Sequence, residues 1–235
     1  MAAAGEVACV SAPSGWRIVG WAALSAIHLL WFGTAHAGRP LSVDDAAVNA
    51  AGAGHVEAWL AHTRGQRAQW TVAPAYAPIE NLELAVAATH GGEIRGGSYA
   101  LQAKAVLPWR FGPLGLGASL GAAREAQAGG AGVTRTTRTF GTALATLKLS
   151  DDWALNLNLG RQRQQASAAV TTWGLAGEWS WGKTAFHVER FGVRGTPATS
   201  QLGARYAVSE AWQLDGTLGR SAGVRLLSVG VKRQF

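Results

Sequence analysis

The sequence predicts an all-β protein: an antiparallel transmembrane β-barrel of about 12 strands, preceded by a cleaved N-terminal signal peptide. Three observations carry this prediction. The chain begins with an export signal, its remainder alternates apolar and polar residues with period two, and its connections alternate between polar and tight. The composition agrees, because 31 Gly and 11 Trp against 7 Pro are typical of closely packed strands with aromatic belts.

The N-terminal residues contain the parts of a secretory signal in the usual order. Arg17 precedes an apolar run at 18–32, and Ala35 and Ala37 then form a small-residue cleavage site. The run of about 15 residues is shorter than the roughly 20 of a spanning helix, so we expect cleavage rather than a membrane anchor. The predicted parts are a signal peptide at 1–37, a periplasmic lead-in at 38–54 and an outer-membrane barrel at 55–235.

The strands are predicted from alternation. Residues 153–160, WALNLNLG, place Trp and Leu on one face and Ala, Asn and Gly on the other. The segment at 134–149 has a mixed phase, for which we expect a bulge. The predicted strands are 55–62, 68–76, 82–90, 98–109, 114–125, 134–149, 153–160, 169–181, 184–191, 201–208, 212–220 and 225–235.

The connections alternate in character along the chain. The odd ones are polar, Gly-rich or Arg-rich, whereas the even ones are mostly tight turns. Membrane barrels have short periplasmic turns and longer external loops, so this alternation favours a barrel over a soluble sandwich. The odd connections lie at 63–67, 91–97, 126–133, 161–167, 192–200 and 221–223, and the even ones at 77–81, 110–113, 150–152, 182–183 and 209–211.

Aromatic residues flank the even turns, which predicts an aromatic girdle at one membrane interface. The chain ends on Phe235, with Leu227, Val229 and Val231 on the same face. This resembles the assembly signal of bacterial outer-membrane proteins, from which Arg233 departs. The predicted girdle consists of Tyr76, Trp109, Trp153, Trp179, Trp181 and Trp212.

One hairpin register follows from a short turn. If the turn is centred on Glu210, Val208 lies opposite Trp212 and Tyr206 lies opposite Leu214. Arg205 then faces Asp215 as an opposite-charge pair on the inner face.

The charged residues predict a polar lumen. These charges either pair to hold the barrel together or line a path for solutes. The predicted lumen-lining residues are Glu57, Glu83, Lys104, Glu178, His187, Glu189, Arg205, Asp215 and Lys232. Arginines of the odd loops and strand edges predict contact with lipopolysaccharide phosphates and a weak anion preference: Arg64, Arg67, Arg95, Arg124, Arg135, Arg161, Arg163, Arg194 and Arg220.

Several kinds of chemistry are not expected. The net charge of +7 is not gathered into a basic run, so nucleic acid is not a predicted partner. The one cysteine, Cys9, lies in the signal, and the histidines have no metal-ligand spacing. Two residues after His187 the chain has Glu189, where an outer-membrane lipase needs a Ser. We therefore predict no enzyme, no metal and no cofactor.

The first third of the mature chain resembles proteobacterial outer-membrane proteins related to phenol meta-pathway channels. The resemblance rests on RPL at 39–41, DDA at 44–46, VEAW at 56–59, NLEL at 81–84 and QAK at 102–104. It implies an outer-membrane barrel for uptake of hydrophobic or aromatic compounds, and it brings no catalytic residues.

Together these patterns predict a Gram-negative outer-membrane channel for passive passage of small solutes of hydrophobic, aromatic or anionic type. The alternative is a structural or partner-binding barrel without an open pore, and a lipid hydrolase is a weaker one. The expected partners are outer-membrane lipid and lipopolysaccharide, the barrel-assembly machinery and a small solute.

Overall fold

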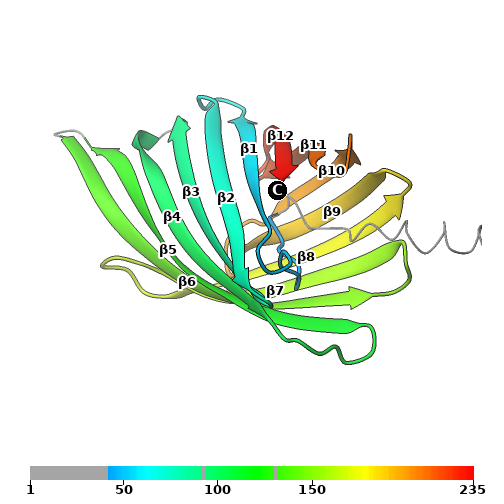
Figure 1. Ribbon diagram of the computed structural model, residues 1–235. Coiled ribbons are helices and arrows are strands. Elements are labelled where there is room, and N and C mark those ends of the chain that lie inside the picture. Colours follow the sequence, from blue (N-terminus) through cyan, green and yellow to red (C-terminus); the bar gives the residue numbers. More distant parts are fainter. Residues whose placement is uncertain (1–41, 92–93, 130–131) are drawn as a thin grey trace, which may run out of the picture. The chain divides into compact units, whose positions relative to one another are not determined.

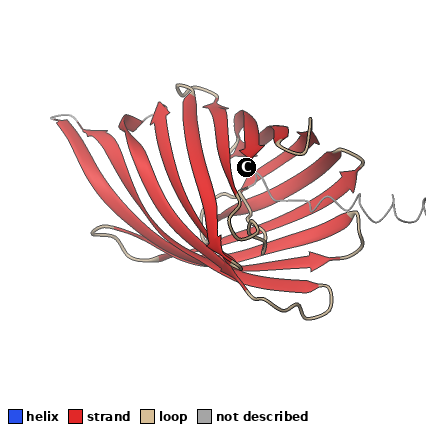
Figure 2. Cartoon of the chain, viewed as in Figure 1, coloured by secondary structure: helices blue, strands red, loops and turns tan. Residues whose placement is uncertain are grey.

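The computed structural model describes residues 42–91, 94–129 and 132–235, which form twelve strands. Among these residues every regular element is a strand (Figure 2). The predicted signal peptide at 1–37 lies outside the described residues. The strands are β1 (Gly54–Thr63), β2 (Gln69–Ile79), β3 (Leu82–Gly91), β4 (Ile94–Val106), β5 (Leu114–Gly129), β6 (Gly132–Lys148), β7 (Trp153–Gln164), β8 (Val170–Trp181), β9 (Thr184–Val193), β10 (Thr199–Ala207), β11 (Trp212–Ser221) and β12 (Val224–Gln234).

The strands close into one antiparallel barrel (Figure 1). Each strand pairs with its neighbours in the chain, and β1 pairs with β12 from His55↔Gln234 to Thr63↔Leu226. Closure leaves no free sheet edge, so the backbone groups of the strands are satisfied within the sheet. The predicted fold class, an antiparallel barrel of 12 strands, is therefore confirmed.

No helix among the described residues is long and apolar enough to cross a membrane.

Two details of the strands differ from prediction. β6 pairs without irregularity along both neighbours, so the bulge expected at 134–149 is wrong. Its phase is mixed because apolar Phe140 and Leu144 share the inner face with Thr142. Shifts of register lie instead between β2 and β3 near Tyr76 and Ile79, beside a proline that cannot donate to the ladder, and between β3 and β4.

Most odd connections are shorter than predicted, and as a group they are no longer than the even ones, of which 107–113 is the longest, so the predicted contrast in length is wrong. β5 runs to Gly129 and β6 begins at Gly132, so most of the loop predicted at 126–133 is strand. Small residues allow the ladder to continue, and each added pair satisfies backbone groups that a loop would leave to water.

Both barrel termini lie at the end that carries the even turns. The backbone N–H groups of Gly54 and Phe235 each donate to the other residue's carbonyl at 2.9 Å. At the same end, Asn81 adopts a φ of 65° in the tight β2–β3 turn, a conformation that Asn tolerates better than most residues. We call this the turn end, and the opposite end the loop end.

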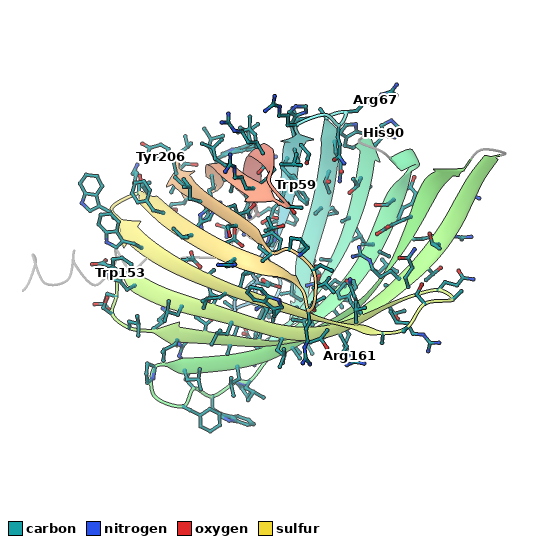
Figure 3. The ribbon with its side chains drawn as sticks, turned by 180° about the vertical axis from the view of Figure 1, so that it is seen from behind. Trp59, Arg67, His90, Trp153, Arg161 and Tyr206 are labelled. Atoms are coloured by element: carbon teal, nitrogen blue, oxygen red, sulfur yellow. The ribbon has the colours of Figure 1, made fainter. Side chains whose placement is uncertain are left out.

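The two faces of the sheet differ in chemistry. Outward residues are largely aliphatic or aromatic and exposed, such as Leu120, Leu159 and Val188, whereas inward residues are largely polar and buried, such as Asn156 and Glu189. Figure 3 shows Trp59 among the side chains within the ring of strands, and Trp153 and Tyr206 at its outer margin. An apolar outside and a polar inside are the pattern of membrane barrels.

The residues of the predicted girdle are all exposed near the turn end, five of them on the outer face of strands and Trp109 in the connection between β4 and β5. Trp153 stacks on Trp179 with ring centroids 5.9 Å apart, and Trp179 stacks on Trp181 at 6.4 Å. The guanidinium of Arg233 lies 5.5 Å from the centre of the Trp212 ring. This cation–π contact accounts for a charged residue at a position where the terminal pattern has an apolar one.

Candidate functional site: the barrel lumen and its inner segment

Residues 42–49, which we call the inner segment, lie inside the barrel (Figure 1). Side chains from β3, β4, β6, β7 and β9, which are spread around the ring, all bond to these eight residues. Only a position within the lumen allows contact with such widely separated strands. The lead-in predicted at 38–54 is thus an internal element over its described part, rather than a segment outside the barrel.

Glu189 on β9 holds the beginning of the inner segment. Its Oε2 accepts the backbone N–H groups of Ser42 at 2.6 Å and Val43 at 2.8 Å. Its Oε1 accepts Gln201 Nε2 at 2.7 Å. An irregular segment has no ladder for its N–H groups, and a carboxylate that accepts two of them satisfies both by charge-assisted bonds.

Val43 anchors the segment by packing. It is fully buried, and it lies against Gly174 on β8. A Cβ atom at Gly174 would lie 2.8 Å from Cγ2 of Val43, closer than carbon atoms approach in proteins. The missing side chain of Gly174 therefore provides the space that Val43 occupies.

Two acidic residues of the segment meet one lysine. Lys104 Nζ on β4 donates to Asp44 Oδ1 at 2.8 Å and to Asp45 Oδ1 at 3.1 Å. From the opposite wall, Asn158 on β7 accepts the Asp44 N–H and donates to the Asp44 carbonyl, each at 2.7 Å. This two-way amide contact copies a backbone pairing and fixes the segment across the lumen.

A chain of hydrogen bonds continues from the segment around the wall. Ala46 N–H donates to Thr146 on β6, Thr146 donates to Asn156 on β7, and Asn156 donates to Glu178 on β8. Glu178 in turn forms an ion pair with Arg205 on β10. Such a connected network couples the position of the segment to four strands.

The last part of the segment bonds to the strands on either side of β2. The backbone N–H and the Nδ2 of Asn49 donate to Glu83 Oε2 on β3, at 3.1 and 2.7 Å. The same Nδ2 lies 2.8 Å from His55 Nδ1 on β1. Beside it, Lys232 Nζ lies 3.7 Å from Glu57 Oε1.

A cavity of about 290 Å³ remains between the inner segment and the wall made by β1 to β7. Its polar lining includes Glu57, Glu83 and Gln102, and its apolar lining includes Trp59 and Phe140 together with several alanines. A volume near 300 Å³ is at the lower end of what small-molecule sites offer.

Carboxylates outnumber cations around the inner segment. Most of the arginines of the odd connections, by contrast, lie on the outer face or at the loop end and are exposed. The acidic groups are Asp44, Asp45, Glu57, Glu83, Glu178, Glu189 and Asp215, against the cations Lys104, Arg205 and Lys232.

The nine predicted lumen residues all point inward, and they divide by what they contact. Glu83, Lys104 and Glu189 bond the inner segment directly, while Glu178 reaches it through other side chains. Arg205 pairs with Glu178, Glu57 with Lys232, and His187 Nε2 lies 3.9 Å from Glu189. Asp215 is the register partner of Arg205.

Sequence reasoning missed the inner segment and the neutral residues that hold it. A usable signal was present at 156 and 158, where two Asn side chains take the inward positions of an otherwise clear strand. Buried amides need partners within the barrel, and a single-layer sheet cannot supply them from its own backbone. Asn156 finds its partners on the neighbouring strands, whereas Asn158 finds them in the backbone of Asp44, so it is Asn158 that indicates an additional element inside.

The described part of the chain does not pair His187 with a serine, and it holds no group of metal ligands. His187 makes no hydrogen bond to a serine there, since both ring nitrogens lack a hydrogen-bond partner. Nor do three or more His, Cys, Asp and Glu side chains converge as metal ligands among those residues.

The comparisons with known proteins bear on family and fold. A family model described as "Uncharacterised conserved protein UCP029691" matches residues 26–230. The chain belongs to this family. No curated protein matches the sequence. The predicted relation to phenol meta-pathway channels is not established by these findings.

Several solved structures of outer-membrane barrels share the fold. "KdgM porin in complex with disordered oligogalacturonate" aligns with a TM-score of 0.61 and 11% identity, covering 77% of this chain and 99% of that chain. The "COG4313 outer membrane channel from Pseudomonas putida F1" gives 0.60 and 14%, covering 85% and 100%. The "Acinetobacter baumannii outer membrane protein Omp33" gives 0.50 and 12%, covering 77% and 97%. The chain therefore has the fold of outer-membrane β-barrel channels.

Proposed function

We propose that the protein is an outer-membrane channel for small solutes whose lumen is closed by the inner segment. The observation that carries the proposal is the inner segment itself. It lies across the lumen, and strand side chains hold it there by hydrogen bonds and ion pairs rather than by a continuous ladder. Such contacts can be exchanged for water, so the segment can leave its position without unfolding the barrel.

The lining of the cavity suggests the class of solute. Trp59 and Phe140 offer aromatic faces, and the carboxylates of Glu57 and Glu83 offer negative charge. This combination favours small neutral or cationic compounds with an apolar or aromatic part. The resemblance of the N-terminal motifs to phenol meta-pathway channels supports an aromatic solute, whereas the acidic lumen argues against an anionic one.

A reversible lock tests the channel. The positions of Val43 and Gly174 are close enough for a disulfide, because a Cβ at 174 would lie 2.8 and 3.4 Å from the two γ-carbons of Val43. The double variant Val43→Cys/Gly174→Cys is purified, inserted into planar bilayers and recorded under oxidising and then reducing conditions. The single variants Val43→Cys and Gly174→Cys are the matched controls.

We expect the oxidised double variant to conduct poorly and to gain conductance on reduction, with no redox effect in the single variants. Equal conductance in both states would mean that solutes pass beside a fixed segment. No conductance in any state, including the wild type, would contradict the channel.

A structural barrel without an open pore is the second candidate. It is favoured by the number of hydrogen bonds to the inner segment. Each backbone N–H from Ser42 to Ala46 donates to a strand side chain, except that of Asp45, which donates to the side chain of Asp44. The same recordings separate the two, because this candidate predicts no conductance even after the lock is reduced.

Location in the outer membrane is part of the proposal. A closed barrel resists unfolding by detergent, so unboiled protein should migrate faster on a denaturing gel than boiled protein. Fractionated cells should carry the protein in the outer membrane. Recovery from the soluble periplasm with heat-independent mobility would contradict this location.

A further inference from the structure

Four exposed arginines lie side by side on the outer face of the barrel, near the loop end. Arg190 on β9 and Arg220 on β11 are both register partners of Ser200 on β10. Arg220 pairs with Arg225 on β12, and the Arg225 carbonyl accepts the N–H of Arg64, which follows β1. We call Arg64, Arg225, Arg220 and Arg190 the arginine row. It crosses five adjacent strands, about 19 Å at about 4.8 Å per strand.

The arginine row has no negative charge of its own to balance it. In the described residues, the arginine ion pairs are those of Arg138 with Glu125 and Arg205 with Glu178. The carboxylates within β9 to β12 and β1 belong to Glu57, Glu189 and Asp215, all on the inner face. Two like charges directly opposite each other on neighbouring strands, as Arg220 and Arg225 are, destabilise a sheet unless an anion lies between them.

The neighbouring outward row locates the arginines relative to the membrane. Two residues closer to the turn end, Val188, Leu202, Leu218 and Leu227 pair in the same order across β9 to β12, and all are exposed. Aliphatic side chains on the outside of a barrel face lipid tails. The arginine row therefore begins where the apolar band ends, at the depth of lipid headgroups, and its long side chains can extend towards them.

We propose that the arginine row is a binding site for the phosphate groups of a phosphorylated glycolipid headgroup in the outer leaflet, the chemistry that lipopolysaccharide offers. Guanidinium groups bind phosphate through paired, charge-assisted hydrogen bonds. A headgroup with two phosphates can bridge Arg220 and Arg225 and so turn their repulsion into attraction. The inference rests on the proposed outer-membrane location but not on the channel.

The test measures lipid binding to the full-length mature protein in detergent by native mass spectrometry. The probes are diphosphorylated lipid A, dephosphorylated lipid A and inorganic phosphate. The variant is Arg220→Gln/Arg225→Gln, which keeps side-chain length and removes both charges. The matched control is Arg124→Gln/Arg163→Gln, which removes two exposed arginines of β5 and β7 that are not register partners. Heat-dependent gel mobility verifies that every variant is a closed barrel.

We expect wild type and control to retain diphosphorylated lipid A, and the Arg220→Gln/Arg225→Gln variant to bind it at least about tenfold more weakly. Inorganic phosphate should compete only at much higher concentration, because it lacks the acyl chains that contact the aliphatic row. Equal binding by variant and wild type, or equal binding of dephosphorylated lipid A, would overturn the proposal. This experiment does not measure conductance, so a failure of the lipid-binding proposal would not count against the proposed channel.

Discussion

Val43 of the inner segment occupies the space that Gly174 leaves by having no side chain. Val43 is fully buried, and a Cβ at Gly174 would lie 2.8 Å from its Cγ2. The inner segment and the barrel wall are thus complementary in shape at this pair, although the two residues are far apart in the sequence. The fit makes this pair the most direct place to disturb the inner segment.

Gly174→Ala should displace the inner segment. The added methyl group cannot fit beside Val43, and overpacking of this kind costs about 1–3 kcal/mol. We expect faster proteolysis of the N-terminal residues and higher conductance, with gel mobility of the barrel unchanged. The control is Gly177→Ala on the same strand, where a Cβ would meet only Leu155 at 3.7 Å, an ordinary contact. Equal protection of the N-terminus in both variants would contradict the fit.

Lys104→Met should loosen the inner segment through charge rather than shape. The substitution keeps an unbranched side chain but leaves Asp44 and Asp45 without the ammonium to which both are bonded. Unpaired acidic groups in a lumen cost about 1–3 kcal/mol, so urea unfolding in detergent micelles should occur at lower denaturant concentration. Lys148→Met, at an exposed position of β6, removes the same charge and should have little effect. Identical midpoints for the two variants would show that the lysine does not hold the segment.

Arg205 should be coupled more strongly to Glu178 than to Asp215. Its Nη2 forms an ion pair with Glu178 two strands away, while Asp215 is its register partner on β11. Double-mutant cycles on unfolding, with Arg205→Met, Glu178→Gln and Asp215→Asn, measure both couplings. We expect the larger coupling energy in the cycle with Glu178. A larger coupling to Asp215 would assign the ion pair to the hairpin instead.

Ion selectivity should follow the inner face. Because carboxylates outnumber cations around the inner segment, reversal potentials under a salt gradient should show a weak preference for cations. This replaces the anion preference expected from the loop arginines, most of which lie outside the lumen. Glu57→Gln/Glu83→Gln should reduce the preference, and the outward control Arg124→Gln should not change it. A clear anion preference in the wild type would contradict the assignment.

The sequence predicts the barrel well where pairing between neighbouring strands decides the structure. The number and order of the strands, the alternation of faces and the β10–β11 register all follow from local pairing. The predicted opposition of Arg205 and Asp215 is confirmed, as is that of Tyr206 and Leu214. The ion pair of Arg205 with Glu178 was not predictable in this way. It bridges strands separated by β9, and its formation depends on how inward side chains fill a closed lumen.

The inner segment could not be predicted for a related reason. Residues 42–49 have no periodicity, because they contact at least seven strands around the ring and do not pair along a ladder. The mixed phase of β6 was observed correctly but explained wrongly. Phe140 and Leu144 point inward to line the lumen, so apolar residues occur on both faces.

The position of the inner segment also constrains the order of folding. Ser42 bonds to Glu189, which is 147 residues away, and the chain leaves the lumen directly into β1, the strand that closes the barrel by pairing with β12. A hairpin can form from neighbouring residues, but these contacts require most of the sheet to exist. We therefore expect the inner segment to bind to the curved, still open sheet first. The pairing of β1 with β12 then closes the barrel around a segment that is already in place.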